Sequence, residues 1–360
     1  MAGQTWHSIA LQFRARRNLE AASRLKVEGI PPRNSSFSVH EQMSPWSTVE
    51  LLTESVSPNS GPAFRRGARL MMDRRTFLQL STAAALPLLS GAIGAQGQAR
   101  FPIGLQLSTL VKHSMPEPDL VKTLEQIRGI GFQEIEPWHT VYSIPAKRLR
   151  HAITASGLTV SCGHFEYSDL AADLAGQLQY AKTLGLKWVI CPMLPKAQWM
   201  SPDGYHAAAR QFNAWAARAH DIGMGFAFHN HDYEFRKFDG TTGYEILLKE
   251  TDPNLVFYEM DCYWITQAGL DPVRVLHQLG RRVRMLHIKD RKPGFPPSND
   301  MSQSSAHFTE VGSGSIDWPA ILHVAKKLPI EHYFIEQDHI DGPPLESLRA
   351  SYTYLRKILS

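Results

Sequence analysis

The sequence predicts an α/β fold of the (β/α)8 TIM barrel class, formed as a single domain after an N-terminal leader and a signal segment. Residues 100–360 span about 260 positions, which is the usual size of one such barrel. Within that range, short apolar runs alternate with stretches in which apolar residues recur at helical spacing. The main alternative is an open doubly wound sheet, but no GxGxxG motif opens any of the expected helices. Eight alternating units fit a closed barrel better than an open sheet.

Eight apolar runs are expected to form the barrel strands. They occupy residues 103–107, 134–136, 159–163, 188–192, 225–230, 256–261, 284–289 and 333–337. Helical periodicity is found at residues 120–127, 149–153, 170–181, 205–219, 244–248, 273–279, 321–325 and 345–355. A glycine precedes the next strand at four junctions, where a left-handed residue commonly ends a helix: Gly131, Gly157, Gly185 and Gly223. The repeated occurrence of a helix-ending glycine before a strand favours a fold built from repeated strand–helix units.

The N-terminal part of the chain does not read as part of the barrel. Residues 1–70 are rich in Arg, Ser and Pro and lack sustained periodicity, so we expect them to be disordered or to belong to an over-extended reading frame. In residues 71–99, the sequence DRRTFLQ, which starts at Asp73, precedes a short apolar stretch and an Ala-rich exit. That stretch is too short for ~30 Å of hydrocarbon. The segment resembles a twin-arginine signal peptide.

This signal predicts export by the twin-arginine machinery to the periplasm or out of the cell, with no stable membrane anchor once the signal is removed. Met71 or Met72 is then the expected start of translation, because a signal peptide lies at the N-terminus. Translation from Met1 would argue against export.

The positive net charge of the chain lies in the leader. Residues 1–75 carry an excess of five positive charges, so the remaining residues sum to −1 within the total of +4. A barrel close to neutral offers no basic footprint for nucleic acid, and we expect no nucleic-acid partner. The three cysteines, Cys162, Cys191 and Cys262, form no CxxC pair and indicate neither a disulfide framework nor a zinc knuckle.

Ionisable side chains end six of the eight expected strands. In chain order they are Glu134 and Glu136, His164, His229 and His231, Glu259 and Asp261, His287 and Lys289, and Glu336. The carboxyl ends of barrel strands meet at one mouth, and residues two apart on a strand share a face. Enclosing such groups is costly unless they are paired or bind a metal. A mixed set of imidazoles and carboxylates without thiolates suits a divalent cation such as Mn²⁺, Zn²⁺, Co²⁺ or Mg²⁺.

Four segments around these residues resemble the sugar phosphate isomerase/epimerase family of the xylose isomerase-like barrels. In chain order they are FHNHDYEF at 228–235, YEMDCYW at 258–264, LHIKD at 286–290 and FIEQD at 334–338, and the resemblance as a whole extends over about residues 101–359. The resemblance implies a divalent metal held by Asp261, His287 and Glu336. On the fifth strand many relatives carry Glu, whereas this chain carries His229 at the matching place, with His231 as a rival ligand.

The same resemblance implies a reaction that removes a proton from carbon next to a carbonyl group. A divalent cation on the carbonyl and hydroxyl oxygens stabilises the developing negative charge while a side chain takes the proton. We therefore predict a metal-dependent isomerase or epimerase of small carbohydrates. Glu136 or His231 would be the acid or base, and His164 and Lys289 would orient substrate oxygens.

Three alternatives remain open at this point. A lyase or dehydratase acting on keto-sugars or keto-glycosides would use the same residues and lose a β-substituent. A sugar-binding barrel without catalysis fits the number of ionisable strand ends least well. An abasic-site endonuclease of the same superfamily would need a basic groove, which the net charge opposes. The oligomeric state is left open.

Several neighbouring residues also have two readings. Trp138 and Trp264 follow the second and sixth strands, so they either stack on a sugar ring or belong to the core. Lys289 either joins the site or forms a surface ion pair with Asp290. The segment Gly312–Gly314 (GSG) is a weak candidate for a phosphate-binding loop.

Overall fold

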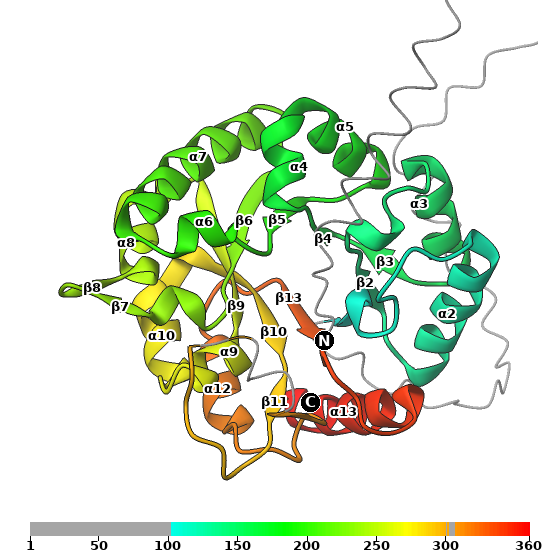
Figure 1. The fold of residues 1–360 in the computed structure, drawn as a ribbon. Coiled ribbons are helices and arrows are strands. Elements are labelled where there is room, and N and C mark those ends of the chain that lie inside the picture. The colour runs from blue at the N-terminus through cyan, green and yellow to red at the C-terminus, as the bar shows by residue number, and fades with distance from the viewer. Residues whose placement is uncertain (1–101, 300, 302–306) are drawn as a thin grey trace, which may run out of the picture. The chain divides into compact units, whose positions relative to one another are not determined.

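The computed structural model describes residues 102–299, 301 and 307–360, which form a ring of strands surrounded by helices (Figure 1). The predicted leader and the predicted signal segment at 71–99 lie outside the described residues. The predicted TIM barrel is confirmed.

The strands are arranged as a nearly closed parallel barrel. They are β1 (Ile103–Gln106), β2 (Glu134–Glu136), β3 (Thr159–Val160), β4 (Cys162–His164), β5 (Trp188–Cys191), β6 (Gly225–His229), β9 (Val256–Asp261), β10 (Val283–Ile288) and β13 (His332–Ile335). The hydrogen-bonded order is β3-β2-β1-β13-β10-β9-β6-β5-β4. Each neighbouring pair is parallel.

The single strand expected at 159–163 is divided in the structure. β3 pairs with β2, whereas β4 pairs with β5 on the other side. Only Ser161 separates β3 from β4, so the chain itself joins the two ends of the sheet there. The eight expected strand positions are therefore present, with the third one interrupted.

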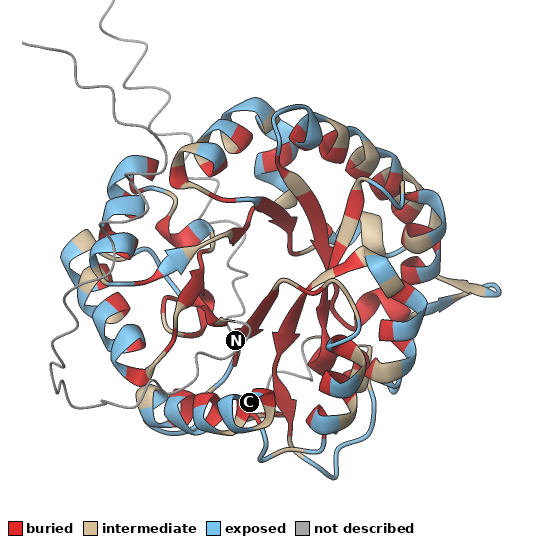
Figure 2. Cartoon of the chain, turned by 180° about the vertical axis from the view of Figure 1, so that it is seen from behind, coloured by how far each residue is buried: buried red, intermediate tan, exposed pale blue. Residues whose placement is uncertain are grey.

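Helices cover the outside of the barrel (Figure 1). They are α2 (Glu117–Ile130), α3 (Ala146–Ala155), α4 (Tyr167–Ala172), α5 (Leu174–Leu184), α6 (Lys196–Trp199), α7 (Pro202–Asp221), α8 (Gly243–Glu250), α9 (Cys262–Gln267), α10 (Pro272–Leu279), α12 (Trp318–Ala325) and α13 (Pro344–Leu359). Figure 2 shows their buried faces turned toward the strands and their exposed faces turned outward. Among the described residues, no helix combines the length and the apolar character needed to cross a bilayer.

Local sequence explains where these helices begin and end. In α7, the Ser201 hydroxyl accepts a hydrogen bond from the Gly204 amide, and Pro202 occupies the first turn, where its missing N–H costs nothing. The four predicted junction glycines all have positive φ, with values of 125° at Gly131 and 100° at Gly185. A residue with a side chain is rarely stable in that conformation.

Two apolar clusters fill the molecule. The larger one lies between strands and helices and includes Phe226 and Phe228 of β6. The smaller one contains the inward-facing residues Cys162, Trp188, Ile190, Ala227, Met285 and Phe334. We call this second set the barrel floor. These apolar side chains pack beneath the ionisable strand ends. The ionisable residues lie two positions further along the same strands and therefore point to the same side.

Short elements after the strands shape the mouth of the barrel. A single turn of 3-10 helix, η1 (Leu107–Thr109), follows β1, and η3 (Tyr233–Phe235) follows β6. Two small hairpins are formed by β7 (Lys237–Phe238) with β8 (Thr241–Thr242) and by β11 (Asp290–Arg291) with β12 (Phe308–Thr309). All three cysteines are buried and free, as the sequence predicted.

Candidate active site

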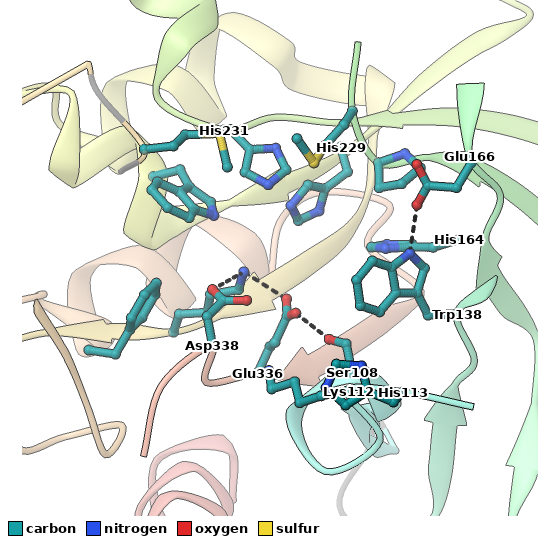
Figure 3. Close-up of a pocket in the computed structure, with 16 residues that line it drawn as sticks. Ser108, Lys112, His113, Trp138, His164, Glu166, His229, His231, Glu336 and Asp338 are labelled. Atoms are coloured by element: carbon teal, nitrogen blue, oxygen red, sulfur yellow. Dashed lines mark hydrogen bonds and ion pairs between the residues drawn. The ribbon is translucent and has the colours of Figure 1, made fainter. Parts of the chain in front are cut away.

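A cavity of about 460 Å³ opens where the barrel strands end (Figure 3). Its lining includes seven residues singled out in the sequence: Trp138, His164, His229, His231, Trp264, Lys289 and Glu336. It also includes Ser108, Glu166 and Asp338, which the sequence did not single out. Glu136, Asp261 and His287 are buried and do not line this cavity. The predicted residues thus divide into a layer that faces the cavity and a layer beneath it.

The three expected metal ligands lie together. Asp261, His287 and Glu336 each offer a ligand atom, and these atoms all lie within 4.8 Å of one another. His287 Nδ1 is 2.8 Å from Glu336 Oε2 and 3.9 Å from Asp261 Oδ2. His229 Nε2 lies 3.7 Å from the same Asp261 oxygen. We call these four residues the ligand set.

A second buried cluster lies on the other side of His287. Its centre is Glu259 Oε2, which is 2.6 Å from His164 Nε2, 3.0 Å from His229 Nδ1 and 3.2 Å from His287 Nε2. Glu136 Oε2 lies 2.8 Å from His287 Nε2 and 3.1 Å from His164 Nε2. We call Glu136, His164 and Glu259 the inner cluster. His287 therefore places one ring nitrogen in the ligand set and the other against the inner cluster.

Glu136 is held in place through one carboxylate oxygen, Oε2, while its buried Oε1 makes no hydrogen bond. Besides the two imidazoles, its Oε2 accepts a hydrogen bond of 2.7 Å from Gln106 Nε2. Gln106 also accepts from the Ser108 amide through its own oxygen, which fixes its orientation. No sequence pattern pointed to Gln106, because an uncharged amide at a strand end has many ordinary roles. Glu259 was visible as the partner of Asp261 on one strand face, but the sequence did not show that it faces three histidines.

The carboxylates of the inner cluster determine which of the nearby histidines are protonated. Burial alone would lower the pKa of His164, but the carboxylates of Glu136 and Glu259 raise it to about 10. The pKa of His287 is also raised despite burial, mainly by Glu259. Burial, together with the neighbouring His287, lowers the pKa of His229 to about 3. Without a metal, His164 and His287 are thus the protonated histidines and His229 is neutral.

The pKa values of the buried carboxylates also depend on burial and on neighbouring charges. Burial alone would raise the pKa values of Glu259 and Glu336, but nearby cations lower both. The main cation is His287 for Glu259 and Lys289 for Glu336. Asp261 differs, because burial outweighs its neighbours and raises its pKa to about 6. The site therefore holds buried negative charge that is balanced by imidazolium and ammonium groups.

Lys289 belongs to the site. Its Nζ lies 2.7 Å from Glu336 Oε2, 3.1 Å from Asp261 Oδ2 and 3.0 Å from Asp338 Oδ2, and the side chain is buried. In Figure 3, dashed lines at the carboxylates of Glu336 and Asp338 mark two of these ion pairs. The alternative reading of Lys289 as a surface partner of Asp290 is wrong.

Asp290 instead organises the segment that follows it. Its carboxylate accepts hydrogen bonds from the amides of Gly312 and Gly314 and from Trp318 Nε1, at 2.8, 3.3 and 2.9 Å. The two glycine amides of the GSG segment are therefore occupied by a carboxylate of the same chain, and the Ser313 amide donates to the carbonyl of Glu310. This correction removes the weak case for a phosphate-binding loop at 312–314.

Two tryptophans and a histidine form walls of the cavity. The ring of His231 stacks on Tyr233 at 5.7 Å and lies 5.1 Å from the ring of Trp264. Burial lowers the pKa of His231 well below 6.5, so this imidazole is neutral. Trp138 donates from its Nε1 to Glu166 at 2.9 Å, as the dashed line in Figure 3 marks.

The ligand set has the properties of a divalent cation site. Two imidazole nitrogens and two carboxylates are the donor types that Mn²⁺, Zn²⁺ and Co²⁺ accept in proteins. Asp261 Oδ2 is buried and makes no hydrogen bond, although Lys289 lies near it. The hydroxyl of Ser108 donates to Glu336 Oε1 at 2.7 Å, which leaves Oε2 directed at His287. The residues present therefore fit the group that the resemblance implied.

Comparison with known proteins agrees with this geometry at the level of fold. The chain is 24% identical over 276 residues to an inosose dehydratase of Clostridium botulinum strain Eklund 17B, covering 67% of this chain and 92% of the relative. An inosose dehydratase of Clostridium botulinum strain Alaska E43 is 26% identical over 165 residues, or 43% of this chain and 55% of the relative. The chain spans little more than half the length of most of the curated relatives it matches.

Solved structures share the fold. A sugar phosphate isomerase/epimerase from Parabacteroides distasonis superposes with a TM-score of 0.60 at 22% identity, covering 73% of this chain and 98% of that one. The IolI protein, solved with a bound zinc atom, gives a TM-score of 0.58 at 16% identity over 72% of this chain and 98% of that one. Residues 124–358, well over half of the chain, match the xylose isomerase-like TIM barrel family. The protein belongs to the xylose isomerase-like TIM barrel family.

Proposed function

We propose that this protein is a divalent-metal-dependent enzyme that removes a proton from carbon next to a carbonyl group of a small carbohydrate. The observation that carries the proposal is the convergence of Asp261, His287 and Glu336, with His229 beside them, under a cavity that a sugar can enter. When bound, the cation would supply the Lewis acidity that stabilises negative charge on the substrate oxygen.

The residues of the chain would divide the remaining work. His231 lines the cavity, and burial lowers its pKa so that the imidazole is neutral, which makes its ring the best-placed base. Glu136, the other candidate, is already an acceptor for three donors and does not face the cavity. Lys289 presents a buried ammonium group to the cavity and would donate to a developing oxyanion or a leaving group.

Walls of aromatic character support a carbohydrate substrate. Trp138 and Trp264 both line the cavity, and a sugar ring presents C–H faces that stack on such rings. Trp138 is held in place by its hydrogen bond to Glu166. Export to the periplasm, suggested by the segment at 71–99, would make an extracellular saccharide the natural source of such a substrate.

We propose elimination as the outcome of the reaction, ahead of the isomerisation or epimerisation that the sequence suggested first. The relatives named above are inosose dehydratases, which eliminate water. Two separate proton-transfer groups, His231 and Lys289, suit a reaction in which one group takes a proton and another protonates the departing oxygen. Isomerisation or epimerisation remains the second candidate, and an L-ribulose 3-epimerase shares the fold with a TM-score of 0.57 at 14% identity, over 72% of this chain and 94% of that one.

One experiment separates these outcomes. Metal-loaded protein would be incubated in D₂O with inososes, keto-sugars and keto-glycosides, and the products followed by NMR and mass spectrometry. Loss of water or release of an aglycone supports elimination, whereas deuterium uptake with an intact skeleton supports isomerisation or epimerisation. Sugar binding without deuterium exchange or product at any metal concentration would contradict the proposed function and favour a binding protein.

A further inference from the structure

We propose that Glu259 is a positioning residue that fixes opposite ring tautomers of two metal-binding histidines, His229 and His287. This inference rests on the ligand set of the proposed function, but it concerns metal binding and not the reaction. One carboxylate oxygen would hold Nδ1–H of His229 and Nε2–H of His287. The lone pairs that remain, on Nε2 of His229 and Nδ1 of His287, would then both face Asp261.

The contacts of the two rings carry this argument. His229 Nδ1 lies 3.0 Å from Glu259 Oε2, while its Nε2 lies 3.7 Å from Asp261 Oδ2. In His287 the two nitrogens are exchanged, because Nε2 lies 3.2 Å from Glu259 Oε2 and Nδ1 lies 3.9 Å from Asp261 Oδ2. A carboxylate only accepts hydrogen bonds, so the His229 nitrogen that faces Glu259 carries the proton and Nε2 is available as a ligand. His287 meets carboxylates on both sides, because its Nε2 also lies 2.8 Å from Glu136 Oε2 and its Nδ1 lies 2.8 Å from Glu336 Oε2. A bound cation would take the place of the Nδ1 proton, while Glu259 and Glu136 would hold the proton on Nε2.

Strand register explains why the tautomers differ. β9 lies between β6 and β10, and Glu259 pairs in register with His229, whereas His287 pairs with Asp261 two residues further on. Glu259 therefore lies level with His229 and reaches Nδ1, the ring nitrogen nearer to the His229 backbone. It lies two residues closer to the amino-terminal end of the barrel than His287, so it reaches Nε2, the ring nitrogen farther from the His287 backbone. The assignment follows from the offset of two strands and needs no adjustment of either ring.

The inner cluster is not itself the better metal site. Ligand atoms of His164, His229, Glu259 and His287 also lie within 4.8 Å of one another, but Glu259 is the single carboxylate in that group, and its Oε2 is shared by the three imidazoles at 2.6 to 3.2 Å. The ligand set offers two carboxylates, and Asp261 Oδ2 makes no hydrogen bond. Two ligands on one cation with bonds of about 2.1 Å stand about 3–4 Å apart. The distances of 3.7 and 3.9 Å from Asp261 Oδ2 to His229 and His287 fit that spacing.

His164 shares the same acceptor but is not oriented as a ligand. Its Nε2 lies 2.6 Å from Glu259 Oε2 and 3.1 Å from Glu136 Oε2, and its Nδ1 faces Gln106. Neither ring nitrogen is therefore turned toward Asp261. The structure thus distinguishes two histidines with one nitrogen turned toward Asp261 from a third with none.

The first test compares two buried glutamates that both accept a hydrogen bond from a histidine. Glu259→Gln is the test variant, and Glu134→Gln is the matched control, because Glu134 Oε2 is 2.8 Å from His332 Nδ1 and lies outside the ligand set. Titration calorimetry with Zn²⁺ should show affinity reduced about 10- to 100-fold by E259Q, the usual effect of removing the group that orients a ligand. E134Q should leave the affinity unchanged within about twofold.

Two results of this comparison would overturn the proposal. Unchanged affinity in folded E259Q would mean that Glu259 does not orient the histidines. Complete loss of binding in E259Q, matching the loss expected for Asp261→Asn, would make Glu259 a ligand and not a positioning residue. Circular dichroism and thermal unfolding would establish that each variant is folded.

The second test needs no variant and so remains decisive if E259Q does not fold. Wild-type protein labelled with ¹⁵N at histidine and loaded with ¹¹³Cd²⁺ should show cadmium coupling at Nε2 of His229 and at Nδ1 of His287. Coupling at the opposite nitrogens, or at His164, would contradict the tautomer assignment while leaving a metal enzyme intact. Absence of any bound cadmium would instead contradict the proposed function. The two failures are therefore distinguishable.

Discussion

The inside of the barrel contains two layers that both bury histidine against glutamate, and they differ in one respect. At the amino-terminal end, His332 Nδ1 meets Glu134 Oε2 at 2.8 Å, and His332 stacks on Phe334 of the barrel floor. At the carboxyl end, one oxygen of Glu259 is shared by three imidazoles. We call Glu134 and His332 the lower pair, and the inner cluster together with the ligand set the upper layer. In the lower pair one histidine meets one glutamate, whereas in the upper layer ring nitrogens remain turned toward Asp261 and the cavity.

This contrast shows that burial of charge does not by itself mark a functional site. Glu134 and His332 are also buried, but neither lines the cavity at the mouth of the barrel. What distinguishes the upper layer is that ligand atoms of Asp261, His287 and Glu336 converge within 4.8 Å of one another beneath a cavity. The following experiments test that distinction, from the largest expected effect to the smallest.

The largest effect is expected from removing a ligand. Asp261→Asn should abolish tight binding of a divalent metal and reduce activity to background, because it removes the carboxylate charge that His229 and His287 face. Metal content of the purified variant, measured by mass spectrometry, checks this. Retention of one equivalent of metal by an Asp261→Ala, His287→Ala double variant with an intact fold would refute the ligand set.

Removing the proposed base should separate chemistry from metal binding. His231→Asn is expected to lower kcat by roughly 10²- to 10⁴-fold, the usual contribution of a positioned acid or base, with metal affinity nearly unchanged. His206→Asn is the control, because His206 lies on α7 and pairs with Glu250 far from the cavity lining. Wild-type rates of substrate deuterium exchange in the His231 variant would remove this residue from the mechanism.

The barrel floor should affect stability and not metal binding. Phe334 lies between His332 and His287, with ring centroids at 5.9 and 6.0 Å. Phe334→Leu leaves a cavity and is expected to cost roughly 1–3 kcal/mol of unfolding free energy, measured by urea titration. Zinc affinity should stay within a few-fold of wild type. A larger loss of affinity than of stability would mean that the two layers are not separate.

The smallest effect is a pH dependence from the lower pair. Burial would lower the pKa of His332, but Glu134 raises it above its usual value of 6.5. The folded protein then binds a proton that the unfolded chain releases above that value, so this contribution to stability is present below pH 6.5 and is lost as the pH rises through the raised pKa. Urea unfolding of metal-free protein at about pH 6 and pH 8.5 should show a smaller decrease for Glu134→Gln than for wild type. Equal decreases would show that the pair does not contribute.

Much of this architecture was accessible from the sequence. Strand ends were visible because apolar runs stop at ionisable residues, and parallel strands of a barrel bring those ends to one mouth. This pattern therefore predicts that Asp261, His287 and Glu336 lie at one mouth of the barrel. The break of the third strand at Ser161 was not visible, because it depends on which neighbour each half pairs with.

The role of Glu259 shows where sequence reasoning stops. Its spacing from Asp261 indicated a shared strand face, but its contacts with three histidines depend on the register of β6, β9 and β10. That register includes a shift between Val283 and Met285, which no local pattern reports. Lys289 was ambiguous for the same reason, since a lysine before an aspartate has no preferred partner until the loop is placed.

The central claim is that four residues from four strands hold one cation beneath the cavity. Crystals of the protein soaked in Mn²⁺ or Zn²⁺ and measured at the metal absorption edge would locate the ion directly. We expect a single strong anomalous peak bounded by His229 Nε2, Asp261 Oδ2, His287 Nδ1 and Glu336 Oε2. A peak among His164, Glu259 and Glu136, or no peak in the barrel at saturating metal, would contradict the account.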